Sequence, residues 1–368
     1  MRAKSLTPRE RVERALRGEA VAPVPFTMYE SKIPQCTAER ELRNRGLCIV
    51  KRDVPVYKIR HPNVKITQHV YWEGDRRFTR TYYETPCGTL TTLGEEAGFT
   101  TWWHERMYKR PEDYAALRAL IADQVYEPAY DSFRRAEEAF GPDAIFRASF
   151  GLEPLQALIS GSYMKMQDFC LEWMDRRDEI LALYELLVEK RRRLYPLVAQ
   201  SPAGHANYGG NVVPAIIGPR VFEEYYVPHY NEAAEVMHRH GKLIGCHFDA
   251  DSRLIAEAIA RTDLDYIEAF TPAPDTDMTL AEARAAWPDK VLWLNFPSSV
   301  HLRPDDEVEA FTVDLLNELD SCRGLIMGIT EDIPEERWQA SCRAIMDGLE
   351  RHAREYPAKY PITPQAAS

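Results

Sequence analysis

An imidazole and two carboxylates lie within five residues of each other, at His247, Asp249 and Asp251, directly after the apolar run Lys242-Leu243-Ile244. In an alternating strand these three side chains point to the same face, so metal ligands or proton carriers would share one strand end. Cys246 would point to the opposite face, as a buried thiol. This combination of groups predicts acid–base or metal-assisted chemistry.

Short apolar runs that alternate with helical patterns supply the elements that would position these groups. There are eight, at residues 24–29, 47–50, 144–150, 205–208, 243–247, 265–270, 291–296 and 325–330. Strands separated by amphipathic helices are typical of parallel α/β folds, and we predict a (β/α)8 TIM-type barrel. Near residues 65–100, aromatic residues interleaved with charges and turns predict an antiparallel hairpin insertion.

Polar residues lie at or just beyond the ends of most of these runs, where a barrel places its chemistry. Each has a purely structural interpretation, such as capping a helix or holding a loop. Together they are harder to explain, because several carboxylates in one place cost stability unless a metal or substrate offsets their charge. They are Glu30, Asn207, His247 with Asp249, Glu268, Asn295, and Glu331 with Asp332.

Composition limits the class of protein. The formal net charge of −11 over 368 residues argues against binding nucleic acid or an anionic membrane. Seven cysteines without a C-x-x-C pair argue against a disulfide framework or a zinc finger. No apolar run of about 18 residues and no signal-like start is present, so we expect a cytoplasmic protein. We predict one domain over residues 1–355 and a loose tail over residues 356–368.

Several motifs across nearly the whole chain resemble the uroporphyrinogen decarboxylase superfamily, in particular its methyltransferase-like branch. The two late strands that end at His247 and Glu331 belong to this resemblance. So do Thr7-Pro8-Arg9-Glu10-Arg11-Val12, Ala15-Leu16-Arg17-Gly18-Glu19, Val24-Pro25, Thr85-Pro86-Cys87-Gly88-Thr89-Leu90, the segment 218–228 and His240-Gly241-Lys242.

The resemblance does not favour haem-pathway decarboxylation. Porphyrinogen decarboxylases carry an arginine-bearing loop after the first strand that neutralises substrate carboxylates. Here that place reads Met28-Tyr29-Glu30-Ser31-Lys32-Ile33-Pro34, with one acid, one lysine and no arginine. Such a loop is poorly matched to a tetrapyrrole with many carboxylates.

Zinc-dependent methyltransferases of the superfamily carry a His-x-Cys after the fifth strand and a further Cys after the eighth. In this chain His247 keeps the histidine, Asp249 replaces the first cysteine, and Thr330-Glu331-Asp332 occupies the place of the second. The resemblance therefore implies a zinc site formed by His247, Asp249 and Glu331. Carboxylate ligands leave more positive charge on the metal, which suits an oxygen donor better than a soft thiol.

The predicted function is methyl transfer between a small methoxylated or methylated compound and a corrinoid (cobalamin), which we expect to be the cofactor of a separate corrinoid protein. The resemblance also implies a homodimer. We expect His247, Asp249 and Glu331 to be metal ligands or, without metal, an acid and its orienting partners. Glu268 would be a supporting acid or base. The predicted substrate-binding residues are Tyr29, Lys32, Arg147, Asn207, Tyr208 and Asn295.

Two alternatives are open at this point. The first is a decarboxylase or lyase of a small carboxylic acid, in which Lys32 or Arg147 pairs the carboxylate and Asp249 or His247 handles the proton. A requirement for corrinoid separates it from methyl transfer. The second is a non-catalytic barrel that binds a ligand, for which His247→Ala and Glu331→Ala would change ligand affinity by less than about threefold.

Overall fold

The computed structural model describes residues 6–98 and 100–361. Its contacts divide the chain into two compact units. The barrel unit comprises Met1–Pro55, Asp131–Ser149 and Pro202–Ser368, and the insertion unit comprises Val56–Tyr130 and Phe150–Ser201. The barrel unit contains one sheet and the insertion unit two, as described below. Within the described ranges, no helix combines the length and the apolar character needed to cross a membrane.

The barrel unit contains a nearly closed parallel sheet with the order β10-β11-β12-β13-β14-β15-β1-β2-β9. The two ends of this order, β9 and β10, are separated along the chain by Arg147 alone, so the parallel barrel architecture agrees with the prediction. Nine strands are present instead of eight, because the run at residues 144–150 is divided at Arg147. The strands are β1 (Phe26–Tyr29), β2 (Cys48–Lys51), β9 (Ala144–Phe146), β10 (Ala148–Ser149), β11 (His205–Asn207), β12 (Leu243–His247), β13 (Tyr266–Phe270), β14 (Val291–Leu294) and β15 (Leu325–Ile329).

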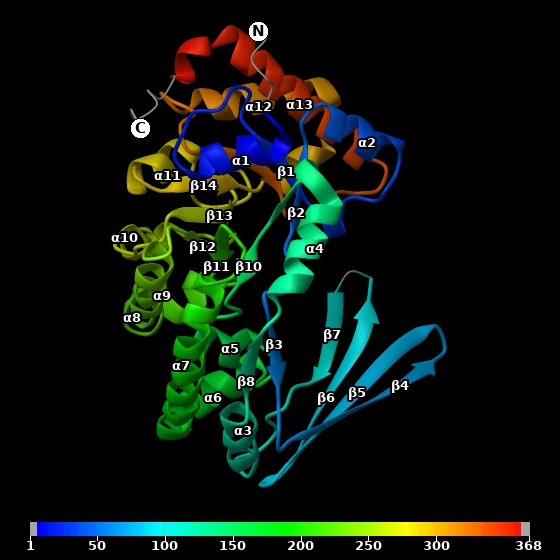
Figure 1. Cartoon of the computed structure of the whole chain (residues 1–368), viewed down its shortest axis with the longest axis vertical. Coiled ribbons are helices and arrows are strands. Elements are labelled where there is room, and N and C mark those ends of the chain that lie inside the picture. The colour runs from blue at the N-terminus through cyan, green and yellow to red at the C-terminus, as the bar shows by residue number, and fades with distance from the viewer. Residues whose placement is uncertain (1–5, 99, 362–368) are drawn as a thin grey trace. The chain divides into compact units, whose positions relative to one another are not determined.

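These strands are almost completely buried, as expected for parallel strands that lie between a packed interior and a layer of helices. Large side chains fill the interior, among them Tyr29, Tyr266 and Trp293. The helices run beside the strands in Figure 1. They are α1 (Pro8–Leu16), α2 (Thr37–Asn44), α4 (Tyr130–Phe140), α8 (Pro214–Tyr225), α9 (Val227–His238), α10 (Ala256–Ala260), α11 (Leu280–Ala286), α12 (Asp305–Asn317) and α13 (Trp338–Glu355), with short 3-10 helices η1 (Glu30–Lys32), η2 (Gly141–Asp143), η3 (Arg253–Ile255), η4 (Ser298–Leu302) and η5 (Pro357–Lys359).

The insertion unit contains a four-stranded antiparallel sheet where the sequence predicted a hairpin. Its order follows the chain: β4 (Lys65–Glu73), β5 (Arg76–Thr85), β6 (Gly88–Ala97) and β7 (Thr100–Glu105). Antiparallel pairing was therefore predicted correctly, but the sheet has two more strands and extends to residue 105. The unit also contains the pair β3 (Tyr57–Arg60) and β8 (Val125–Pro128), with helices α3 (Asp113–Ala122), α5 (Pro154–Ser160), α6 (Met166–Asp175) and α7 (Arg177–Ala199).

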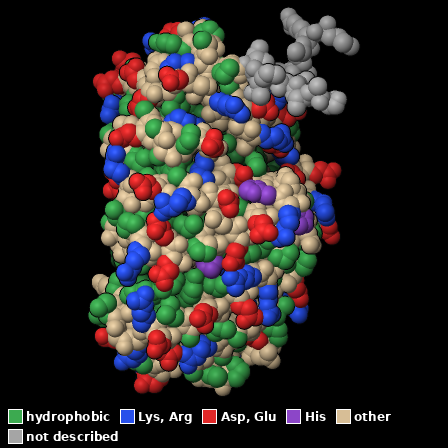
Figure 2. All heavy atoms as spheres, turned by 90° about the vertical axis from the view of Figure 1, so that its left-hand side faces the viewer, with side chains coloured by type: hydrophobic (Ala, Val, Ile, Leu, Met, Phe, Trp, Pro, Cys, Tyr) green, Lys and Arg blue, Asp and Glu red, His purple; other side chains and the backbone are tan. Residues whose placement is uncertain are grey.

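Charged side chains of both signs are interspersed over the face shown in Figure 2.

Near the C-terminus, the predicted tail is partly held by hydrogen bonds. Lys359 Nζ donates to the carbonyl of Leu319 at 2.7 Å, and the Tyr360 hydroxyl lies 2.7 Å from Nδ1 of His352. Residues 362–368 of that tail lie outside the described residues.

Candidate active site

Three predicted metal ligands converge at the carboxyl ends of the barrel strands. His247 is the last residue of β12, Asp249 follows it by two positions, and Glu331 follows the end of β15 by two positions. One ligand atom from each lies within 4.8 Å of the others. His247 Nε2 and Asp249 Oδ2 are 3.3 Å apart. We call these three residues the ligand cluster.

Asp251 does not belong to this cluster, and the prediction that it shares a face with His247 and Asp249 was wrong. Strand β12 ends at His247, so side-chain alternation does not continue through the next four residues. Asp251 is exposed and accepts a hydrogen bond from the backbone of Asp277 at 3.1 Å. Cys246, inside the strand, is fully buried as predicted.

Glu268, on the neighbouring strand β13, fixes the orientation of the His247 ring. Its Oε2 lies 2.7 Å from Nδ1 of His247, and the Tyr29 hydroxyl lies 3.3 Å from the same nitrogen. With Nδ1 engaged by a carboxylate, Nε2 is the atom that faces Asp249. Histidines that bind metals usually donate the other ring N–H to a carboxylate in this way.

Glu268 is itself fully buried and is held by three further groups. Arg147 Nη1 lies 2.8 Å from Oε1, as an ion pair that does not meet hydrogen-bond geometry. The Tyr29 hydroxyl donates to Oε1, and Asn207 Nδ2 donates to Oε2 at 3.0 Å. A buried carboxylate requires such partners to remain charged.

The backbone leaves regular strand geometry directly after Glu268. Ala269 has φ +60°, in the left-handed region that residues other than glycine rarely adopt. The pairing of β13 with β14 shifts register between Glu268 and Phe270, which marks a β-bulge. Bulges and strained residues are common at functional sites, where they re-aim side chains.

The charges in this network shift one another's pKa values. Burial lowers the pKa of His247, but Glu268 and Asp249 outweigh it and raise the pKa to about 9. Burial raises the pKa of Glu268, yet Arg147 and His247 bring it well below its usual range. The pKa of Asp249 is lowered because His247 outweighs burial, whereas burial and the nearby Asp249 raise the pKa of Glu331. The metal-free cluster therefore holds a protonated imidazole at neutral pH.

Of the predicted substrate-binding residues, the two asparagines have their carboxamides engaged by the protein. Asn207 accepts from the Tyr266 hydroxyl at 2.6 Å in addition to its bond to Glu268. Asn295 donates to Thr271 Oγ1 at 3.2 Å and accepts from the backbone N–H of Thr330 at 2.9 Å. Because Thr330 precedes Glu331, Asn295 positions the segment that carries the third ligand.

The remaining predicted residues occupy different environments. Tyr208 is fully buried, and its ring packs edge-on against Tyr230 of α9. Lys32 forms an ion pair with Asp332 at 3.0 Å. Arg147 neutralises Glu268, so its charge is used inside the protein.

Sequence reasoning missed two residues next to this network. Gly210 has φ +144°, and a Cβ built there would lie 3.1 Å from Cβ of His247. The run Gly209-Gly210-Asn211 after β11 was a usable signal, because consecutive glycines mark a close backbone approach. Arg52, directly after β2, lies over the Tyr29 ring, and no local pattern indicates this contact.

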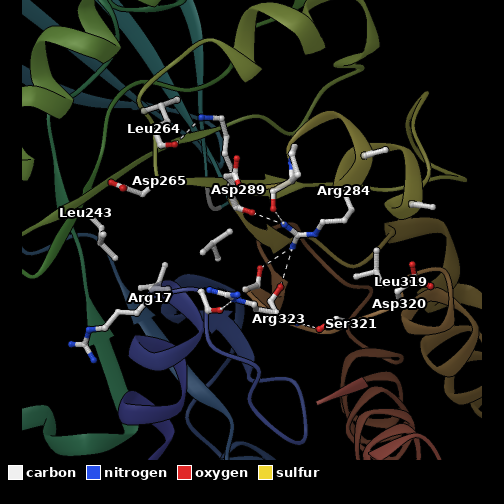
Figure 3. A pocket seen from close by; sticks show the side chains of 18 of the residues that line it. Arg17, Leu243, Leu264, Asp265, Arg284, Asp289, Leu319, Asp320, Ser321 and Arg323 are labelled. Atoms are coloured by element: carbon white, nitrogen blue, oxygen red, sulfur yellow. Dashed lines mark hydrogen bonds between the residues drawn. The ribbon is translucent and has the colours of Figure 1, made fainter. Parts of the chain in front are cut away.

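A hollow of about 850 Å³ lies at the opposite, amino ends of the strands (Figure 3). Leu243 and Val291, the first residues of β12 and β14, line it. Arg284, in its centre, donates to the carbonyls of Lys290 at 2.7 Å and Gly324 at 3.2 Å. Because Arg284 is bound to backbone carbonyls, this hollow has a structural explanation, in keeping with the stabilising role of that barrel face.

No model of a known protein family matches the chain, and no curated protein matches it. Among solved structures, a methyltransferase from Methanosarcina mazei is similar with a TM-score of 0.54 and 10% identity, covering 94% of this chain and 99% of that chain. A structure of the tandem GH20 catalytic modules of the pneumococcal exo-β-D-N-acetylglucosaminidase StrH is similar with a TM-score of 0.38 and 8% identity, covering 94% and 86%. The TM-score of the second structure is too low to support an argument. The first likeness, at 10% identity, shows the fold alone.

Proposed function

We propose that this protein is a metal-assisted methyltransferase that moves a methyl group between a small methoxylated or methylated compound and a corrinoid carried by a partner protein. The observation that carries the proposal is the convergence of His247, Asp249 and Glu331 at the carboxyl ends of the strands. The methyltransferase fold of the M. mazei neighbour and the resemblance to the methyltransferase-like branch support the class of reaction.

The ligand cluster fits a zinc ion. Two ligands of one tetrahedral zinc, each about 2.1 Å from the metal, lie roughly 3.4 Å apart. His247 Nε2 and Asp249 Oδ2 are separated by 3.3 Å, and the ligand atoms of all three residues, Glu331 included, lie within 4.8 Å of one another. One imidazole and two carboxylates give a neutral site with zinc and leave a fourth position for substrate.

Zinc held there supplies a Lewis acid for the oxygen from which the methyl group departs, since a free alkoxide is a poor leaving group. Glu268 keeps the Nδ1 proton of His247 in place and so directs the Nε2 lone pair toward the cluster. Arg147 balances the charge of Glu268, which keeps that carboxylate ionised in a buried position. We assign no residue to a corrinoid, which acts here as a co-substrate.

The two cations predicted to hold a substrate carboxylate in decarboxylation are both paired within the protein. That alternative requires Lys32 or Arg147 to pair a substrate carboxylate, but Arg147 is paired with Glu268 and Lys32 with Asp332. Measuring carbon dioxide release beside methyl transfer separates the two reactions directly.

Metal analysis of the purified protein is the first test. We expect about one zinc per chain in the parent and a loss of metal in His247→Ala and Glu331→Ala. Asp251→Ala is the matched control, because it removes a carboxylate from the same segment outside the cluster.

The second test is the methylation of cob(I)alamin by a panel of methoxylated donors, which is monitored by absorbance. Failure of every donor, or unchanged activity in both cluster variants, would overturn the proposal.

A further inference from the structure

Arg52 is connected to the ligand cluster through Tyr29. Its guanidinium carbon lies 3.9 Å from the centre of the Tyr29 ring. The hydroxyl of the same ring lies 3.3 Å from Nδ1 of His247. Arg52 directly follows β2, and Tyr29 is the last residue of β1, so both lie at the carboxyl ends of neighbouring parallel strands. The guanidinium is therefore placed at the same end of the barrel as the ligand cluster.

Arg52 differs from the other cations around the cluster in having no acidic partner. Each of the others forms an ion pair: Lys51 with Glu30 and Asp53, Lys32 with Asp332, and Arg147 with Glu268. Arg52 is exposed, and none of the carboxylates in residues 6–98 and 100–361 forms an ion pair with it. Its charge is thus available to a ligand.

The contact with Tyr29 also prepares the guanidinium for binding. A guanidinium stacked on an aromatic ring keeps its N–H donors at the edge of the plane, where they reach a carboxylate in a bidentate manner. The buried ring restricts the arginine side chain beforehand, which lowers the entropy lost on binding.

We propose that Arg52 binds a carboxylate of the substrate. The substrate class is then a small methylated carboxylic acid that places its methylated oxygen at the cluster while Arg52 holds the acid group. The methyl-transfer part of this statement rests on the proposed function. The carboxylate contact is testable by itself.

Matched ligand pairs test the contact by calorimetry on the full-length protein without corrinoid. The probes are methoxyacetate and 2-, 3- and 4-methoxybenzoate, each compared with its neutral primary amide. In the parent, we expect at least one acid to bind about tenfold tighter than its amide, in line with a charge-assisted pair. Arg52→Gln should lower the affinity for that acid by threefold or more and leave the affinity for its amide unchanged. Arg52→Lys should bind the acid with an affinity between those of the parent and Arg52→Gln, because lysine keeps the charge without the planar fork.

Arg17→Gln is the matched control. Arg17 is also exposed and its replacement removes the same charge, but it lies at the end of α1 and lines the hollow at the amino ends of the strands. The Arg17→Gln protein should keep the parent's preference for acids over their amides. Thermal unfolding of each variant shows whether the fold is preserved. A parent that prefers no acid over its amide, or an Arg52→Gln protein whose preference changes by less than threefold, overturns the inference.

The two proposals fail in different ways. If Arg52→Gln abolishes the preference for acids but no donor methylates cob(I)alamin, the carboxylate site stands and the proposed reaction is wrong. If methyl transfer from acid donors proceeds equally well in Arg52→Gln, the reaction stands and the role of Arg52 is wrong.

Discussion

Glu268 and His247 are register partners on adjacent parallel strands, and Oε2 of Glu268 lies 2.7 Å from Nδ1 of His247. Their contact is therefore set by the alignment of β12 with β13. Any shift of one strand along the other would separate the two side chains. The orientation of the histidine in the ligand cluster depends on this alignment and on the groups that keep Glu268 charged.

Replacing Glu268 tests this dependence. In Glu268→Gln, Nδ1 of His247 loses its carboxylate, and we expect metal affinity to fall about 10–100-fold. The unfolding free energy should fall by about 3–5 kcal/mol, because the buried Arg147 loses its counter-charge. Chelator competition and urea unfolding measure the two effects. The double variant Arg147→Met/Glu268→Gln should regain stability but not metal affinity. A single variant with parental metal affinity would contradict the role of Glu268.

The pKa of His247 predicts a specific pH dependence of stability in the metal-free protein. Its folded-state pKa of about 9 lies above the usual 6.5. The stabilisation by the protonated ring is therefore fully present below about pH 6.5 and is lost as pH rises through about 9, amounting to up to about 3 kcal/mol. Urea unfolding at several pH values measures it. His247→Gln should flatten the profile in this window; an equally steep profile in that variant would assign the effect to another group.

Gly210 is expected to be required for the position of His247. Alanine at this position meets Cβ of His247 at 3.1 Å and adopts an unfavourable φ of +144°. Gly241→Ala is the control, because φ is also positive there, at +66°, but no atom lies within 4 Å. Both variants should lose roughly 1–3 kcal/mol of stability from backbone strain. Only Gly210→Ala should lose metal, as measured by metal content. Equal metal content in the two would show that the steric contact is unimportant.

Tyr29 is expected to have two separable roles. Tyr29→Phe removes the hydroxyl that donates to Glu268 but keeps the ring beneath Arg52. We expect a loss of about 1–3 kcal/mol in stability, since a buried carboxylate loses a donor. The preference for carboxylates over amides should persist in Tyr29→Phe and weaken in Tyr29→Leu, which lacks the ring. Calorimetry with the ligand pairs and urea unfolding distinguish the roles, and identical ligand preference in both variants would contradict the part assigned to the ring.

Much of the barrel sheet was predictable from local sequence. Strand β12 occupies residues 243–247 as predicted, and the other barrel strands fall within their predicted runs to within one or two residues. Parallel strands are buried on both faces, so they appear as continuous apolar runs bounded by polar residues. The insertion sheet was less predictable. Alternation indicated antiparallel strands, but the number that pair depends on contacts between segments far apart in the chain.

For the site, the sequence alone determined the types of donor, one imidazole and several carboxylates at strand ends, because those residues lie at or just beyond the ends of apolar runs. Only the tertiary structure decided which acids meet the imidazole. Asp251, four residues from His247, lies outside the cluster because the strand ends first, whereas Glu331 joins it from another strand. The links of Glu268 to Arg147 and of Tyr29 to Arg52 also connect different strands. Strand register and sheet closure set these contacts, and both are properties of distant segments that no local pattern records.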